Sequence, residues 1–182
     1  MSNTLTRSIR FAGLTLLSGT LLFAASPARS EPMCEDIKKY VEGKAAQPFM
    51  QNHGTAIGPN QWKARRQIRP GDCTVMSSAT PTLHALTCIF NKGAEQSELL
   101  SYSEKLGADI QTCLDSLNSR FDWRKRDTSR TEADGRSVRE TTWIWTMLRD
   151  QTERQVRVSN IVGGADPSRD ALIVLWRSLD DN

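Results

Sequence analysis

The chain has 182 residues, a quarter of them charged, and its 24 Lys and Arg residues exceed its 21 Asp and Glu residues by three. That excess equals the three arginines of the first thirty residues, so the remainder carries 21 bases and 21 acids. A balanced chain gives no reason to expect nucleic-acid binding. About 150 residues make one ordinary domain with a core of its own, so we expect residues 31–182 to form a single domain.

Residues 1–30 have the pattern of a secretory signal peptide. Arg7 and Arg10 precede an apolar run over residues 11–25, and Ala28-Arg29-Ser30 has the small residues of a cleavage site. We expect cleavage after Ser30, because the apolar run is short for a bilayer-spanning helix. An uncleaved N-terminal anchor is the alternative. The residues before Cys34 do not form a lipobox. We therefore expect a periplasmic or secreted bacterial protein without a stable membrane anchor.

All four cysteines lie after the predicted cleavage site, and an even number in an exported protein predicts two disulfides. Of the three possible pairings we expect Cys34–Cys73 with Cys88–Cys113. The second bond would join a strand to the helix after it, and the first would hold the N-terminal segment. The chain has no CxxC pair and only two histidines, so we expect neither a zinc site nor any other metal or cofactor.

The segment before residue 91 is expected to begin with a short helix and a long loop. Alternating apolar and polar residues then predict the first of three strands, and Pro70-Gly71 favours a turn after it. The predicted elements are a helix over 35–42, a loop over 43–61, and strands over 62–68, 73–77 and 83–90.

Residues 94–117 carry the clearest periodic signal in the chain. Apolar residues recur there at steps of three and four, which places them on one stripe of an α-helix. The stripe consists of Leu99, Tyr102, Leu106, Ile110, Cys113, Leu114 and Leu117. We expect one long amphipathic helix that covers a sheet.

The C-terminal part is predicted to consist of strands. Asp134-Gly135 is a hairpin signal, and no internal repeat is visible. Alternation predicts strands over 120–127, 137–148 and 154–162, whereas the apolar run 171–176 fits either a covered strand or a helical turn. Consecutive strands favour antiparallel pairing. We therefore expect an α+β fold, with a curved antiparallel sheet of about six to seven strands packed on the one long helix.

Catalytic and metal motifs are scarce. The sequence has no GxSxG nucleophile motif, and the two acids of Asp166-Pro167-Ser168-Arg169-Asp170 read as a turn rather than a calcium loop. His53 and His84 are the candidate catalytic bases. The simpler interpretation is that one is a loop residue and the other a strand-surface residue.

Two groups of residues are candidates for binding. The first is a basic patch that would form if two strands were neighbours, and it would suit carboxylates or phosphates. Its members are Lys63, Arg65, Arg69, Arg120, Arg124 and Arg126. A solvated face that discourages aggregation is the alternative. The second candidate is an aromatic face of Trp143 and Trp145, although such a pair is more often part of a core.

No motif identifies a family, so function is expected only as a class. The first hypothesis is an exported, non-catalytic binding protein, inhibitor- or immunity-like, whose partner is an envelope or secreted protein or an anionic ligand. The second is a small periplasmic hydrolase of phosphodiesters or peptidoglycan with a histidine base. The third is a structural or assembly protein of the bacterial envelope.

Overall fold

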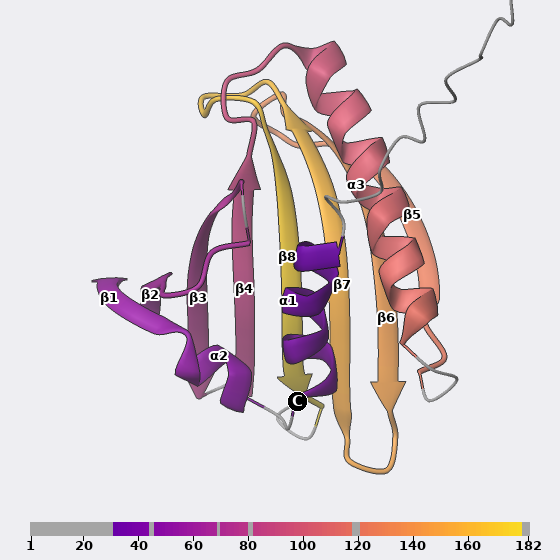
Figure 1. The fold of residues 1–182 in the computed structure, drawn as a ribbon. Helices are drawn as coiled ribbons and strands as arrows, with labels where there is room; N and C mark the ends of the chain where they lie inside the picture. Colours follow the sequence, from indigo (N-terminus) through magenta and orange to yellow (C-terminus); the bar gives the residue numbers. More distant parts are fainter. Residues whose placement is uncertain (1–30, 44–45, 69, 80–81, 118–120, 180–182) are drawn as a thin grey trace, which may run out of the picture.

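A computed structural model describes residues 31–43, 46–68, 70–79, 82–117 and 121–179 (Figure 1). The predicted signal peptide lies outside these residues, as do Arg69 and Arg120 of the predicted basic patch.

Eight strands form one open antiparallel sheet in the order β1-β2-β3-β4-β8-β7-β6-β5. The strands are β1 (His53–Gly58), β2 (Gln61–Ala64), β3 (Asp72–Ala79), β4 (Thr82–Phe90), β5 (Arg124–Thr131), β6 (Ser137–Met147), β7 (Thr152–Val162) and β8 (Arg169–Ser178). Each half of the sheet is a four-stranded meander preceded by helix, and the halves join through the central β4–β8 pair. The architecture therefore repeats although the sequence shows no repeat.

Three helices cover one face of this sheet: α1 (Glu31–Glu42), α2 (Gln47–Gln51) and α3 (Gln96–Ser116) (Figure 1). We call this the inner face and the opposite one the outer face. The predicted stripe of α3 is buried, and it packs over β7 and β8. On the inner face Val75, Leu86, Val156 and Val174 complete the core.

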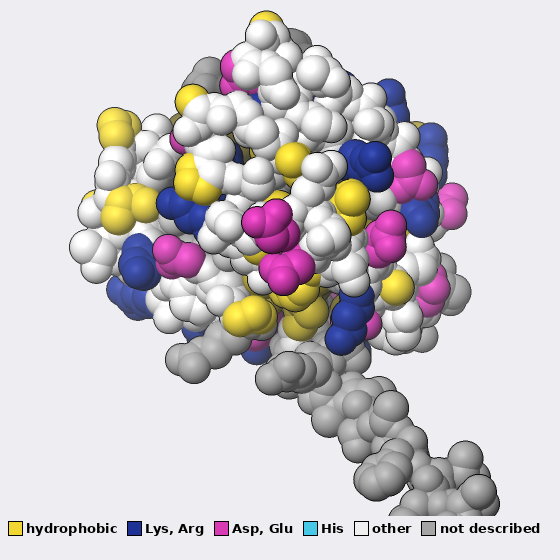
Figure 2. All heavy atoms as spheres, turned by 90° about the horizontal axis from the view of Figure 1, so that it is seen from above, with side chains coloured by type: hydrophobic (Ala, Val, Ile, Leu, Met, Phe, Trp, Pro, Cys, Tyr) yellow, Lys and Arg dark blue, Asp and Glu magenta, His cyan; other side chains and the backbone are white. Residues whose placement is uncertain are grey.

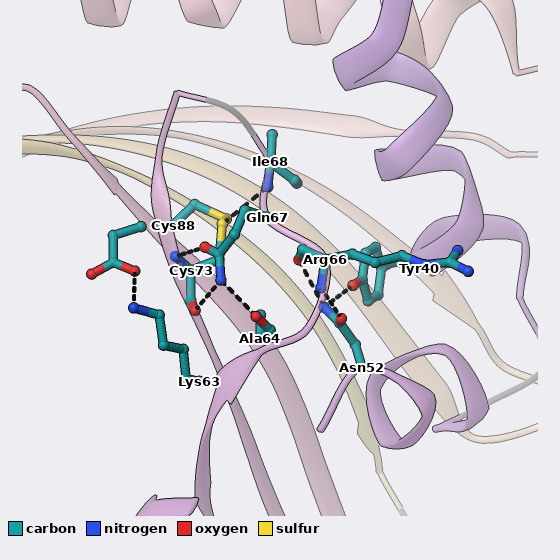
Figure 3. The surroundings of a disulfide bond; sticks show 10 residues. Tyr40, Asn52, Lys63, Ala64, Arg66, Gln67, Ile68, Cys73 and Cys88 are labelled. Atoms are coloured by element: carbon teal, nitrogen blue, oxygen red, sulfur yellow. Dashed lines mark hydrogen bonds and ion pairs between the residues drawn. A yellow bond between two sulfur atoms is a disulfide. The ribbon is translucent and has the colours of Figure 1, made fainter. Parts of the chain in front are cut away.

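Both predicted disulfide pairings are wrong. Cys34 of α1 is bonded to Cys113 of α3, and Cys73 of β3 is bonded to Cys88 of β4. The β3–β4 hairpin places Cys73 directly opposite Cys88, and both are fully buried (Figure 3). Cys113 lies on the buried stripe of α3, where α1 packs against it. The bonds thus join two helices and two adjacent strands.

Several element boundaries also differ from expectation. The sheet has eight strands, because residues 43–61 hold α2 and β1 rather than a loop alone. The strand predicted over 62–68 ends at Ala64, and the one predicted from residue 120 begins at Arg124. The hairpin at Asp134-Gly135 is confirmed, with Gly135 at a φ of +82°. Residues 171–176 lie in β8 and are a strand.

Two disulfides indicate an oxidising, exported location. Within the described ranges, no helix is long and apolar enough to cross a membrane.

Candidate functional site

A pocket of about 610 Å³ lies between α1, α2 and the segment that follows β2. Large pockets with a few convergent polar groups are the usual places for ligands. Its charged lining residues are Glu35, Asp36, Lys38, Lys39, Glu42, Arg65 and Arg66.

Asn52 is the residue that organises one wall of this pocket. It ends α2, only 4% of its surface is exposed, and its backbone oxygen accepts a hydrogen bond from Arg65 N at 3.0 Å. Its side chain bonds to the backbone of Arg66 (Figure 3). Oδ1 accepts a hydrogen bond from Arg66 N at 2.6 Å, and Nδ2 donates one to Arg66 O at 3.1 Å. One buried residue therefore fixes the backbone of two consecutive arginines.

Tyr40 connects α1 to the same centre. Asn52 Nδ2 donates to the phenol oxygen of Tyr40 at 2.6 Å, and the ring packs on Phe49 with centroids 5.0 Å apart. Burial raises the pKa of Tyr40 to about 12, against the opposing effect of the Asn52 hydrogen bond. The phenol is therefore neutral at ordinary pH, and its own proton is a hydrogen-bond donor for the pocket.

The junction of α1 and α2 is held by Gly43. A Cβ atom at this position would clash with Pro48 Cγ and with the Lys39 carbonyl oxygen, so the close approach requires glycine. Arg154 Nη2 of β7 donates to Gly43 O at 2.9 Å, which ties the end of α1 to the sheet. The pocket is thus bounded by fixed backbone on both sides.

The charges of the lining are unevenly paired. On α1, Lys38 lies 3.3 Å from Glu35 and Lys39 lies 2.7 Å from Asp36. Arg65, Arg66 and Glu42 also line the pocket, and none of the three makes an ion pair with a described residue. The unpaired groups of the lining are therefore two cations, Arg65 and Arg66, and one anion, Glu42, which leaves a net charge of one positive unit.

The predicted basic patch is not one surface. Lys63 points to the outer face of β2, 3.7 Å from Asp72, whereas Arg65 follows that strand and lines the pocket. Arg124 and Arg126 belong to β5 at the opposite edge of the sheet. The two strands are not neighbours, because five strands (β3, β4, β8, β7 and β6) lie between β2 and β5.

The two histidines meet at one hydroxyl. Ser77 Oγ of β3 lies 3.0 Å from His53 Nε2 and 2.9 Å from His84 Nδ1. His84 is buried beneath Phe49, and His53 stacks on Trp62 with centroids 3.8 Å apart. The expected loop and surface positions are therefore wrong. Burial lowers the pKa of both imidazoles, with smaller effects from Arg65 on His53 and from His53 on His84.

The two tryptophans of β6 do not form an exposed aromatic platform. Trp143 is 1% exposed and its Nε1 donates to Gln111 Oε1 of α3 at 2.7 Å. Trp145 is 9% exposed and packs edge-on against Phe121, with the Arg154 guanidinium 5.4 Å from its ring. Both side chains belong to the core.

The upper end of the molecule carries mixed charges and no patch of one sign (Figure 2). Charges at the turn between β5 and β6 pair locally, since Arg136 lies 2.7 Å from both Glu132 and Asp134. A second, smaller pocket of about 370 Å³ lies between α3 and the inner face of β5–β7.

Asn52, Arg66 and Tyr40 were not predicted as site residues. The Arg65-Arg66 pair is visible in the sequence, but its relation to Asn52 depends on a hydrogen bond across 14 positions. Comparison of the chain with family models, curated proteins and solved structures finds no match.

Proposed function

We propose that the protein is an exported binding module whose larger pocket holds a carboxylate or phosphate group of its ligand. The observation that carries this proposal is the pair of adjacent arginines, braced by Asn52 and without carboxylate partners among the described residues. Arginine binds both anions through two parallel hydrogen bonds, and a fixed backbone reduces the entropy lost on binding.

Two further groups of the lining suit recognition of an anion. The neutral phenol of Tyr40 is a third donor, and Gln51 adds an amide. The two disulfides and the pinned α1–α2 junction support a rigid site in an oxidising compartment. The signal peptide read from residues 1–30 and the periplasmic or secreted location belong to the same proposal.

A second candidate function is a small hydrolase, favoured by the serine that lies between two imidazoles. When both imidazoles are neutral, Ser77 accepts a hydrogen bond from one and donates to the other, which is how a base activates a nucleophile. Neither of the two pockets is lined by these residues. Ester and phosphodiester turnover that is lost in Ser77→Ala would support this function over the binding module.

The experiment for the binding module is a titration of the mature, oxidised protein with inorganic phosphate and with citrate, followed by backbone amide shifts. We expect shifts around residues 40, 52 and 65–66 that disappear in Arg65→Gln/Arg66→Gln. Asn52 bonds to backbone atoms, so these changes keep the wall folded.

The matched control is Arg124→Gln/Arg126→Gln, which removes the same charge from the far edge of the sheet. It should keep the wild-type shifts. The proposed pocket would be contradicted if the two double variants bound phosphate and citrate equally well. Amide shifts centred away from residues 40, 52 and 65–66 would contradict it too.

A further inference from the structure

The sheet ends on one side at β5, and this edge is regular. β5 pairs with β6 at eight consecutive positions, from Arg124 opposite Ile144 to Thr131 opposite Ser137, without a register shift. The other edge strand, β1, has two register shifts. Irregular pairing of this kind protects an edge against a further strand, and β5 lacks it.

The outer edge of β5 is also open. Among the described residues, its backbone makes no hydrogen bond to backbone outside the β5–β6 ladder. Figure 1 shows β5 at the margin of the sheet, beyond β6. Alternate N–H and C=O groups of an edge strand point away from the sheet and can pair with another chain.

The charges of β5 are nearly all positive. Its sequence RKRDTSRT holds four cations and one anion. Arg130 pairs with Glu132 and Glu140, and Lys125 lies 3.9 Å from Asp127. Arg124 and Arg126 are exposed and make no ion pair with a described residue. They lie on the outer face, about 7 Å apart along the strand.

We propose that β5 is the docking edge for an extended, acidic segment of a partner protein, which adds to the sheet as a further strand. Backbone hydrogen bonds to the open edge supply affinity in such complexes, and alternate side chains supply specificity. Carboxylates two residues apart in the added strand would face Arg124 and Arg126. This surface is independent of the proposed anion pocket.

A second copy of the chain does not fit this edge. Two β5 strands side by side would bring together two sets of four cations, and like charges directly opposite each other destabilise strand pairing. An acidic strand has the complementary charge.

The smaller pocket lies over the inner side of the same strand. Its wall is formed by Leu100, Ser103 and Glu104 of α3, and its floor includes Asp127 and Ser129 of β5. An inward-pointing residue of the added strand would lie beside this pocket, whose hydroxyls and carboxylates favour a small polar side chain.

The probe for this edge is a ten-residue peptide of alternating Glu and Thr, added at low salt to the mature, oxidised protein. Amide hydrogen exchange within residues 124–131 is the readout, because strand addition would protect those β5 amides that point away from β6. We expect protection at alternate positions. There are two control peptides: one carries N-methyl groups on its Glu residues, and the other carries them on its Thr residues. The peptide whose N-methyl groups lie on the edge that pairs with β5 should not protect the β5 amides.

Arg124→Gln/Arg126→Gln should weaken peptide binding about tenfold, since it removes two exposed charge pairs. Arg65→Gln/Arg66→Gln, the pocket variant, should bind the peptide as wild type does, so the two proposals fail or succeed separately. Equal binding of all three peptides, protection outside β5, self-association through β5, or no binding by the wild-type protein would overturn the proposal.

Discussion

The side chain of Asn52 holds Arg66 by both of its backbone polar groups, as a neighbouring strand would. Asn52 thereby continues the pairing of the sheet beyond the end of β2, where the ladder has stopped. The two arginines of the pocket consequently leave β2 in a defined direction, although they belong to no strand.

Asn52→Ala should lower the free energy of unfolding by about 2–3 kcal/mol, because it removes a buried hydrogen bond to Tyr40 and two part-buried ones to the backbone of Arg66. It should also weaken phosphate binding. Urea unfolding and the phosphate titration measure the two effects. Gln51→Ala is the control for the unfolding measurement, since Gln51 lines the same pocket and is exposed. Equal losses of unfolding free energy in both variants would show that Asn52 does not stabilise this wall.

Acid should destabilise the protein through its histidines. Burial lowers the pKa of His53 and His84 in the folded state, so the unfolded chain binds more protons as pH falls below 6.5. The free energy of unfolding should therefore decrease as the pH falls from 6.5 through the folded pKa values. Urea unfolding at several pH values should show a shallower decrease for His84→Gln. An unchanged slope would refute the linkage.

The buried carboxyl of Asp170 should have the opposite dependence. Its side chain is 0% exposed, and it accepts hydrogen bonds from Asn160 at 2.9 Å and from Asn91 at 3.3 Å. Burial raises its pKa above 3.8 in spite of these bonds, so ionisation costs stability as pH rises through the folded pKa.

Asp170→Asn should accordingly gain stability relative to wild type as pH is raised from about 4 to about 7, with the unfolding free energy as the measurement. A relative loss of stability with rising pH would show that the two amides hold the carboxylate in its charged form.

Removal of the disulfide that joins α1 to α3 should lower the free energy of unfolding. The Cys34–Cys113 disulfide closes a span of 79 residues, and loop-closure entropy gives it about 4–5 kcal/mol. Cys34→Ala/Cys113→Ala should lose most of this in urea unfolding. A loss under about 1 kcal/mol would mean that residual contacts between the α1 and α3 segments already restrict the unfolded chain.

Sequence reasoning succeeded where a pattern is local. The stripe of α3 and the alternation in β6 and β7 mark buried faces directly, and the structure confirms a helix and strands there. It missed β1, whose six residues are all exposed or half-buried at an edge and therefore show no alternation.

The errors at the site are non-local in origin. Cys73 and Cys88 are partners because of the register of one hairpin, and His53 of β1 and His84 of β4 converge on Ser77 of β3. Such relations depend on which strands pair and in what register, which composition and periodicity do not specify.

The position of β8 has a consequence for how the chain reaches its folded state. β8 is the last of the described strands, yet it lies between β4 and β7 at the centre of the sheet. Until β8 is available, the β4 edge of the first meander therefore stays open, and contacts so distant in sequence form slowly. A chain that ends before Arg169 would present the edges of β4 and β7 together, and it should aggregate instead of remaining half folded.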